Sequence, residues 1–177
     1  NYVARKCSPA LAPWSEKLLA VKRKPHSLQS ISLTPDAAYS ADISSNGLVY
    51  LAPSNPERAL QFWSDFQEKY AFSEEQTREV EYAIALRGLF AETASLVPWL
   101  QEALARLGED KLVEIRLRWA LADQDWAALA ETLPLLSAEG REESAWRYWQ
   151  AVVLERSGDR AAAETLLQGL AKERGYY

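Results

Sequence analysis

The side chains that most often carry out chemistry are few and scattered in this sequence. The 177 residues include one histidine, His26, and one cysteine, Cys7. A zinc site or a Ser–His–Asp triad needs several such side chains at fixed spacing, and a disulfide needs a second cysteine. Neither GxGxxG nor GxxxxGK[ST] occurs, which excludes nucleotide binding through a glycine-rich loop. We therefore interpret His26 as a loop residue and predict no metal site and no cofactor.

One acidic tetrapeptide raises the question of catalysis. Glu143-Ser144-Ala145-Trp146 has the form E-S-x-W and resembles the sequence around the catalytic glutamate of lytic transglycosylase domains. In those domains Asn-Pro follows the motif, and G-L-M-Q-I and A-Y-N-A-G blocks come after it; none of these occurs here. We predict that Glu143 is not catalytic and that this chain contributes no catalytic, cofactor-binding or metal-binding residue.

Aromatic side chains are abundant, with seven tryptophans and eight tyrosines. Aromatic rings that face a groove are surfaces on which sugar rings stack, so a carbohydrate-binding face is one interpretation. Trp63, Trp119 and Trp149 fall on the apolar stripes of predicted helices, where large side chains fill the space between packed helices. For these three we predict core packing in preference to ligand stacking.

The charged residues are unevenly distributed along the chain. Residues 1–30 carry six Lys or Arg against Glu16 alone, whereas the whole chain has a formal net charge of −5. Phosphate binding needs a basic face over most of the footprint, so the acidic body argues against nucleic acid as a partner. We interpret the basic head as a solvated surface. There is no run of roughly 20 apolar residues, and we predict no membrane span.

Helix start and stop signals follow one another from Thr34 onward. Serine, asparagine and aspartate precede apolar residues at helical spacing, and Gly or Pro follows them. The predicted helices begin at Thr34-Pro35-Asp36 and Asn55 and then cover Ser73–Phe90, Ser95–Leu107, Asp110–Ala122, Asp125–Leu133, Glu142–Arg156 and Asp159–Arg174. Residues 1–33 are interrupted by prolines, and only Trp14 to Val21 is predicted helical there. We predict a basic N-terminal segment, 1–33, followed by a helical domain, 34–177.

Two of these segments resemble each other. Asp125 to Leu133 reads DWAALAETL and Asp159 to Leu166 reads DRAAAETL, an offset of 33 to 34 residues. This is the period of tetratricopeptide (TPR) repeats, in which each helical hairpin buries its apolar side against the next. The connections between helices have two to five residues, which favours antiparallel neighbours. The predicted fold is all-α, a right-handed superhelix of antiparallel, TPR-like hairpins.

Several stretches resemble the α-superhelical domain of soluble lytic murein transglycosylases. The resemblance is most specific in the W-R-Y-W-Q-A run that begins at Trp146 and in the terminal R-G-Y-Y that ends at Tyr177. Ser73-Glu-Glu-Gln and Leu112-Val-Glu-Ile-Arg-Leu-Arg-Trp-Ala-Leu121 also resemble that family. The resemblance covers about Thr34 to Tyr177.

This resemblance implies a periplasmic protein of bacterial cell-wall turnover. The family cleaves the bond between N-acetylmuramic acid and N-acetylglucosamine in peptidoglycan, leaving a 1,6-anhydro product, and one glutamate acts first as acid and then as base. That glutamate belongs to a lysozyme-like domain C-terminal to the helices, which would be a partner in cis. We expect the present residues to form a non-catalytic helical scaffold of such an enzyme. The alternative is a TPR-like adaptor that binds a peptide or protein.

Overall fold

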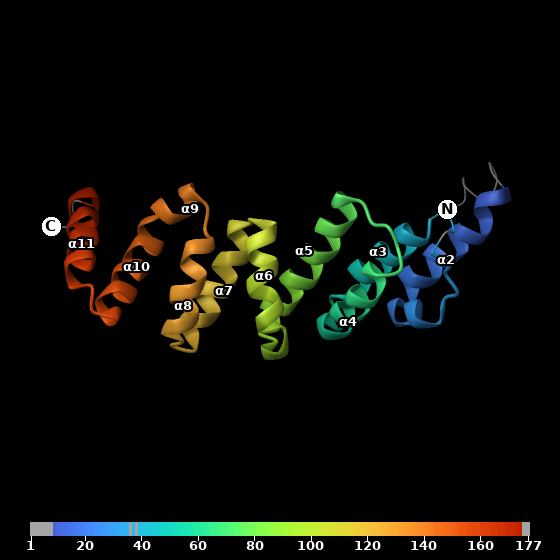
Figure 1. Cartoon of the computed structure of the whole chain (residues 1–177), viewed down its shortest axis with the longest axis horizontal. Coiled ribbons are helices and arrows are strands. Elements are labelled where there is room, and N and C mark those ends of the chain that lie inside the picture. The colour runs from blue at the N-terminus through green and yellow to red at the C-terminus, as the bar shows by residue number, and fades with distance from the viewer. Residues whose placement is uncertain (1–8, 36, 38, 175–177) are drawn as a thin grey trace. The chain divides into compact units, whose positions relative to one another are not determined.

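The structure is a computed structural model that describes residues 9–35, 37 and 39–174, and every regular element among them is a helix (Figure 1). The all-α prediction is confirmed. The chain divides into two compact units, Asn1–Leu100 and Gln101–Tyr177. Cys7, Asp36 and the Tyr176-Tyr177 pair, on which parts of the sequence interpretation rested, lie outside the described residues.

Among its described residues, the first unit contains four α-helices and three short 3₁₀ helices, and α6 (Val97–Leu107) includes the residues at which the two units are divided. The elements of the first unit are η1 (Pro9–Leu11), α2 (Ala12–Arg23), η2 (Pro25–Ser30), α3 (Ser40–Leu51), α4 (Pro56–Gln67), α5 (Glu74–Phe90) and η3 (Ala94–Leu96). The second unit comprises α7 (Asp110–Ala122), α8 (Trp126–Thr132), η4 (Leu133–Leu135), α9 (Ala138–Glu142), α10 (Ser144–Ser157) and α11 (Arg160–Arg174).

Polar caps set the helix starts that the sequence predicts best. The Asn55 side chain accepts a hydrogen bond of 2.9 Å from the Arg58 amide at the start of α4. At the start of α5, Ser73 and Gln76 form a reciprocal capping box, with hydrogen bonds of 2.9 and 3.2 Å. The Asn55 cap and the Ser73–Gln76 box each provide acceptors for backbone amides that have no partner within the helix. The predictions of helices at these two positions are confirmed.

Three predicted helix starts are wrong. Thr34 and Pro35 precede the helix, which begins at Ser40: the Thr34 carbonyl accepts from the Ala37 amide and the Ser40 hydroxyl in a turn, and Tyr39, with a φ of 66°, separates this turn from the helix. Ser95 does not cap α6: it lies inside η3, and its hydroxyl donates to the Glu57 carboxylate instead. The N-terminal helix α2 is longer than the predicted Trp14–Val21 segment, since Pro13 stands in its first turn, where its missing amide costs nothing.

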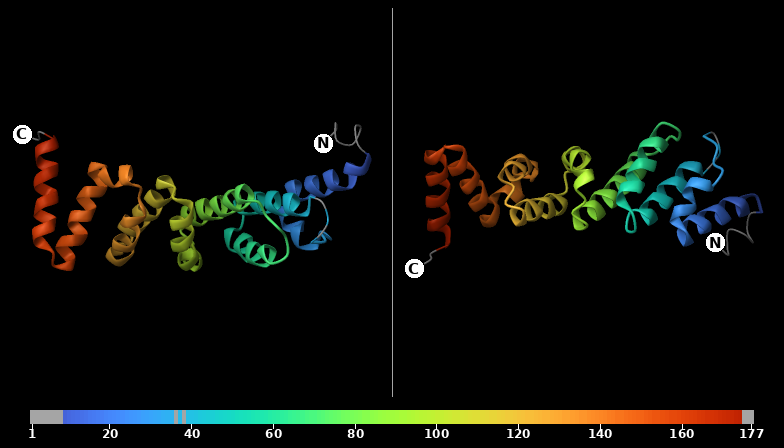
Figure 2. Two further views of the ribbon diagram at one scale, coloured as in Figure 1. Left: turned by 45° about the horizontal axis from the view of Figure 1, so that its top comes forward. Right: turned by 90° about the horizontal axis from the view of Figure 1, so that it is seen from below.

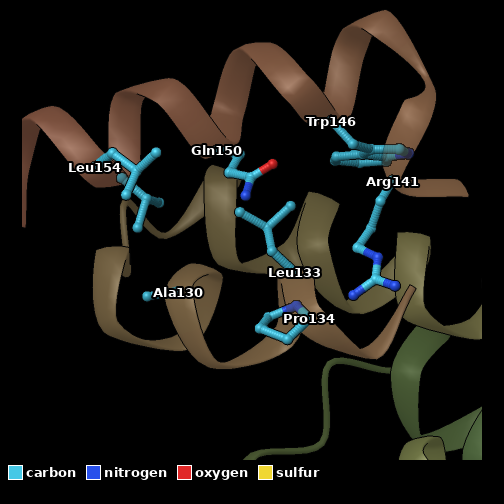
Figure 3. Close-up of a pocket in the computed structure, with 8 residues that line it drawn as sticks. Ala130, Leu133, Pro134, Arg141, Trp146, Gln150 and Leu154 are labelled. Atoms are coloured by element: carbon cyan, nitrogen blue, oxygen red, sulfur yellow. The ribbon is translucent and has the colours of Figure 1, made fainter. Parts of the chain in front are cut away.

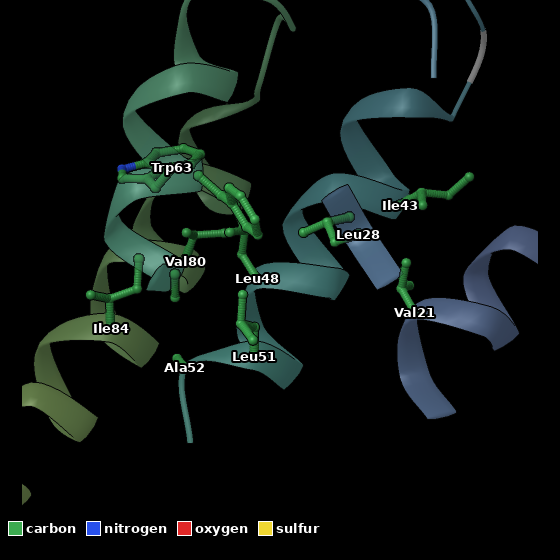
Figure 4. Packing of buried hydrophobic residues seen from close by; sticks show 11 residues of the cluster. Val21, Leu28, Ile43, Leu48, Leu51, Ala52, Trp63, Val80 and Ile84 are labelled. Carbon is green, nitrogen blue, oxygen red and sulfur yellow. The ribbon is translucent and has the colours of Figure 1, made fainter. Parts of the chain in front are cut away.

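The first unit has a continuous apolar core, drawn in Figure 4. Its buried side chains are Val21, Leu28, Ile43, Leu48, Leu51, Ala52, Ala59, Phe62, Trp63, Val80 and Ile84. Gly47 allows η2 to lie close to α3, because a β-carbon at this position would be 2.8 Å from Leu28 Cδ1. Val21 and Leu28 share this core with α3. The predicted division of the chain at residue 33 stays a prediction.

The second unit is built from helical hairpins (Figures 1 and 2). α7 packs against α8. After a two-residue turn that follows α10, α11 runs back along α10. Asp125 and Asp159 start the second helix of each hairpin in the same way. Their carboxylates accept hydrogen bonds from the amides of Ala128 and Ala162, at 3.0 and 3.2 Å. The sequence similarity at an offset of 34 residues therefore marks equivalent structural positions.

The helix that precedes each of these turns also ends in the same way. Gln124 and Gly158 have positive φ angles of 55° and 95°, and the following amide donates to the carbonyl five residues before it, at 2.8 and 2.9 Å. Glu92, after α5, has a φ of 48°, and the next amide makes the same bond at 3.0 Å. This is the hydrogen-bond pattern of a Schellman motif. Three helices, whose ends are 32 and 34 residues apart in the sequence, therefore end with the same hydrogen-bond pattern.

Candidate functional site

The two residues that most suggested chemistry from the sequence occupy structural positions. Glu143 precedes α10 with an exposed side chain, and its backbone carbonyl accepts hydrogen bonds of 3.0 Å from the amides of Trp146 and Arg147. His26 lies in η2, a 3₁₀ turn rather than an irregular loop. Over the described part of the chain, no three His, Cys, Asp or Glu side chains come together as metal ligands would.

The tryptophans predicted to fill the core do so in two of three cases. Trp63 and Trp119 are buried, as their helical spacing predicts. Trp149 is only partly buried, and its neighbours are the rings of Trp126 and Tyr148. The prediction of core packing is therefore wrong for Trp149, because the side of α10 that carries it faces other aromatic rings at the surface.

These rings form a row along the second unit, which we call the aromatic row: Trp126, Trp149 and Tyr148, with Arg156 at one end. The ring centroids of Trp126 and Trp149 are 6.4 Å apart, and those of Trp149 and Tyr148 are 5.2 Å apart. The guanidinium of Arg156 lies 3.8 Å from the centroid of the Trp126 ring, within the range of a cation–π contact. Tyr148 is 46% exposed. The row offers aromatic surface to a ligand.

A second feature of this unit is a pocket of about 330 Å³ between α8–η4 and α10, which we call the hairpin pocket (Figure 3). Its lining residues are Ala130, Leu133, Pro134, Arg141, Trp146, Gln150, Val153 and Leu154. Figure 3 shows Arg141 and Trp146 at one end and Ala130 and Leu154 at the other, with Gln150 between them. The pocket therefore has a polar end and an apolar end.

The position of Arg141 depends on a polar network that anchors α9. Asp110 accepts two hydrogen bonds from Ser137, at 2.7 Å from its amide and 2.5 Å from its hydroxyl. The Ser137 hydroxyl in turn accepts a hydrogen bond of 3.0 Å from the Gly140 amide and caps α9. This network links the start of α7 to the short helix that carries Arg141. The sequence predicted neither α9 nor this site.

A second arginine, Arg147, has a different role. Its Nη1 lies 2.7 Å from both carboxylate oxygens of Glu173, so it joins α10 to α11. This hydrogen bonding from Glu173 raises the pKa of Arg147 further above its ordinary value. Arg147 is thus an occupied, structural cation, in contrast to Arg141.

The comparisons with known proteins agree on one family. No protein-family model matches the chain. The soluble lytic murein transglycosylase of Escherichia coli K12 is 26% identical over 162 residues, 90% of this chain, and that of Salmonella typhimurium is 31% identical over 128 residues, 72% of this chain. The aligned segments are 25% and 20% of those proteins. The chain belongs to the soluble lytic murein transglycosylase family.

Solved structures of lytic transglycosylases share this fold. Slt70 from Escherichia coli matches 98% of the chain with a TM-score of 0.72 and 21% identity, through 30% of its own length. An inactive variant of Slt from Pseudomonas aeruginosa matches 96% of the chain with a TM-score of 0.78 and 23% identity, through 28% of its length. The predicted all-α superhelical class is confirmed by these neighbours.

The chain spans about a quarter of the length of the family members it matches. Among the described residues, none of the helices is long and apolar enough to cross a membrane. The aromatic row and the hairpin pocket therefore belong to a helical segment that corresponds to about a quarter of these relatives.

Proposed function

We propose that this chain is a non-catalytic helical scaffold segment of a periplasmic soluble lytic murein transglycosylase. The observation that carries the proposal is the match of nearly the whole chain to about 28% of Slt, with a TM-score of 0.78. The exposed Glu143, whose backbone only starts a helix, supports a non-catalytic role for this segment. In this proposal the reacting groups lie in a lysozyme-like domain in cis, and the helices support it and guide murein strands.

The surface proposed to meet the glycan is the aromatic row. Its rings are partly or largely exposed, and sugar rings pack their C–H faces against such rings. The acidic composition of the chain makes a purely electrostatic attraction to an anionic polymer a weak alternative. Stacking on these rings is therefore the interaction that we propose.

Co-sedimentation with purified murein sacculi tests this function. We expect the chain to pellet with sacculi and Tyr148→Ala to reduce the bound fraction. The matched control is Phe90→Ala, which removes an aromatic ring that is 65% exposed and outside the aromatic row. Equal binding by both variants contradicts the role of the row, and no binding by the original chain contradicts the scaffold proposal.

A second candidate function is a TPR-like adaptor for a peptide or protein, and the 34-residue repeat of capped turns favours it. An adaptor would capture a protein partner in a pull-down and remain in the supernatant when sacculi are pelleted. The scaffold proposal expects the opposite pattern.

A further inference from the structure

The hairpin pocket contains two polar side chains without partners. Arg141 and Gln150 are exposed residues; the Arg141 backbone amide donates to the Ser137 carbonyl at 3.0 Å, but among the described residues neither the Arg141 nor the Gln150 side chain makes a hydrogen bond or an ion pair. Both line the pocket, and Figure 3 shows the Gln150 amide directed toward Leu133. Arg147, also on α10, is by contrast already bound to Glu173. The pocket therefore presents an unoccupied guanidinium and an unoccupied amide.

The remaining walls restrict what this pocket can accept. Trp146 is only 5% exposed, and the Arg118 guanidinium lies 5.5 Å from its ring centroid, so it has no open face on which a sugar ring could stack. A volume of about 330 Å³ equals about ten water molecules at liquid density, which is too small for a helix but adequate for two small amino-acid residues. The apolar end is formed by Ala130 and Leu154 (Figure 3).

The charge of the polar end indicates the ligand group. A planar guanidinium matches the two oxygens of a carboxylate, and an amide can donate one more hydrogen bond. A single arginine balances the single negative charge of a carboxylate. The apolar end suits a short aliphatic side chain such as the methyl group of alanine.

We propose that the hairpin pocket binds the C-terminal carboxylate of a short peptide that ends in small apolar residues. The assignment of murein stem peptides as the source rests on the function proposed above, whereas the carboxylate chemistry rests on Arg141 and Gln150 alone. The carboxylate pairs with Arg141, the Gln150 amide donates to the peptide, and the residue before the terminal one extends toward Ala130 and Leu154.

The test titrates the isotope-labelled full chain with diacetyl-L-lysyl-D-alanyl-D-alanine and follows the side-chain amide of Gln150 and the indole N–H of Trp146 by NMR. We expect a dissociation constant of about 1 mM, as ligand efficiency allows for so small a group of contacting atoms. The same peptide with a C-terminal amide should bind at least tenfold more weakly. Arg141→Gln should weaken the acid at least tenfold, and Gln150→Leu severalfold.

The matched control is Arg160→Gln, which removes an exposed arginine that does not line the pocket. It should leave the affinity unchanged, and dichroism spectra should show that all variants fold. Equal binding of acid and amide, unchanged binding by Arg141→Gln, or no shift at 10 mM peptide would overturn the proposal. If sacculi pellet the chain while the peptide does not bind, the pocket assignment alone fails. If the peptide binds and sacculi do not, the scaffold function fails.

Discussion

Replacing Gly140 by alanine tests the network that anchors α9. A β-carbon at this position would lie 2.6 Å from Asp110 Oδ2 and 3.0 Å from its Cγ. A β-carbon essentially never lies within 3.0 Å of a non-bonded heavy atom, so the carboxylate must move. Asp110 is held by the amide and the hydroxyl of Ser137, and moving it weakens both hydrogen bonds.

The expected change in the free energy of unfolding combines weaker hydrogen bonds of Asp110 with the higher helix propensity of alanine. A hydrogen bond to a charged group contributes about 1.5–3 kcal/mol, less at a solvent-exposed site such as Ser137. Alanine in place of glycine inside a helix raises the free energy of unfolding by about 1 kcal/mol. Gly140→Ala should therefore lower the free energy of unfolding by about 1–2 kcal/mol. Urea titrations followed by both circular dichroism and tryptophan fluorescence measure this change and test whether unfolding is two-state.

Two controls separate the steric effect from helix propensity. Gly169→Ala places a β-carbon 3.2 Å from Arg147 Nη2, the end of a long side chain, and should be neutral or stabilising by up to about 1 kcal/mol. In an Asp110→Ala background the obstacle is gone, and Gly140→Ala should also become neutral or stabilising. If Gly140→Ala stabilises the original chain as Gly169→Ala does, the reasoning is refuted.

Three other predictions concern caps, core and titration. Asp125→Ala and Asp159→Ala should each lower the free energy of unfolding by about 1 kcal/mol, because each removes an N-cap, whereas the exposed Asp123→Ala should change it little in the same urea titration. Trp63→Ala should lower the free energy of unfolding by about 3–5 kcal/mol in thermal or urea unfolding, because the ring is 1% exposed. Trp63→Phe should lower it less, because it keeps an aromatic ring and removes an indole N–H that has no hydrogen-bond partner. Burial raises the pKa of Tyr70 above its usual value of 10.0. The contribution of Tyr70 to stability is therefore full below pH 10 and is lost as the pH rises through the folded-state pKa. Absorbance at 295 nm should show that Tyr70→Phe removes a phenol that ionises at higher pH than an ordinary tyrosine.

Local signals in the sequence were sufficient for most helices. α5 ends at the predicted Phe90 and begins directly after its predicted cap, Ser73, which forms a box with Gln76; α7 has the predicted ends, and α6 ends at the predicted Leu107, before Gly108 with its positive φ. The repeat at Asp125 and Asp159 also reflects local chemistry, a carboxylate that caps the following helix. Such signals act over about one helical turn, which is why one sequence reveals them.

The missed features depend on longer-range contacts or on unusual residues at turns. Glu92 and Gln124 end their helices with a positive φ, where glycine is the usual residue. The sequence therefore does not predict the Schellman motifs at these two positions. α9 is capped by Ser137, which Asp110 fixes from 27 residues away. The hairpin pocket exists only because Arg141 and residues of α8 and α10 meet, and no periodicity in the sequence predicts that meeting.

The distinguishing claim is that this helical segment supports murein cleavage without performing it. Mass spectrometry of the soluble products after incubation of the chain with purified murein tests that claim most directly. We predict no 1,6-anhydromuropeptides above a protein-free control, and the same result for Glu143→Gln. Release of these products by the original chain, and its loss in Glu143→Gln, would contradict the account.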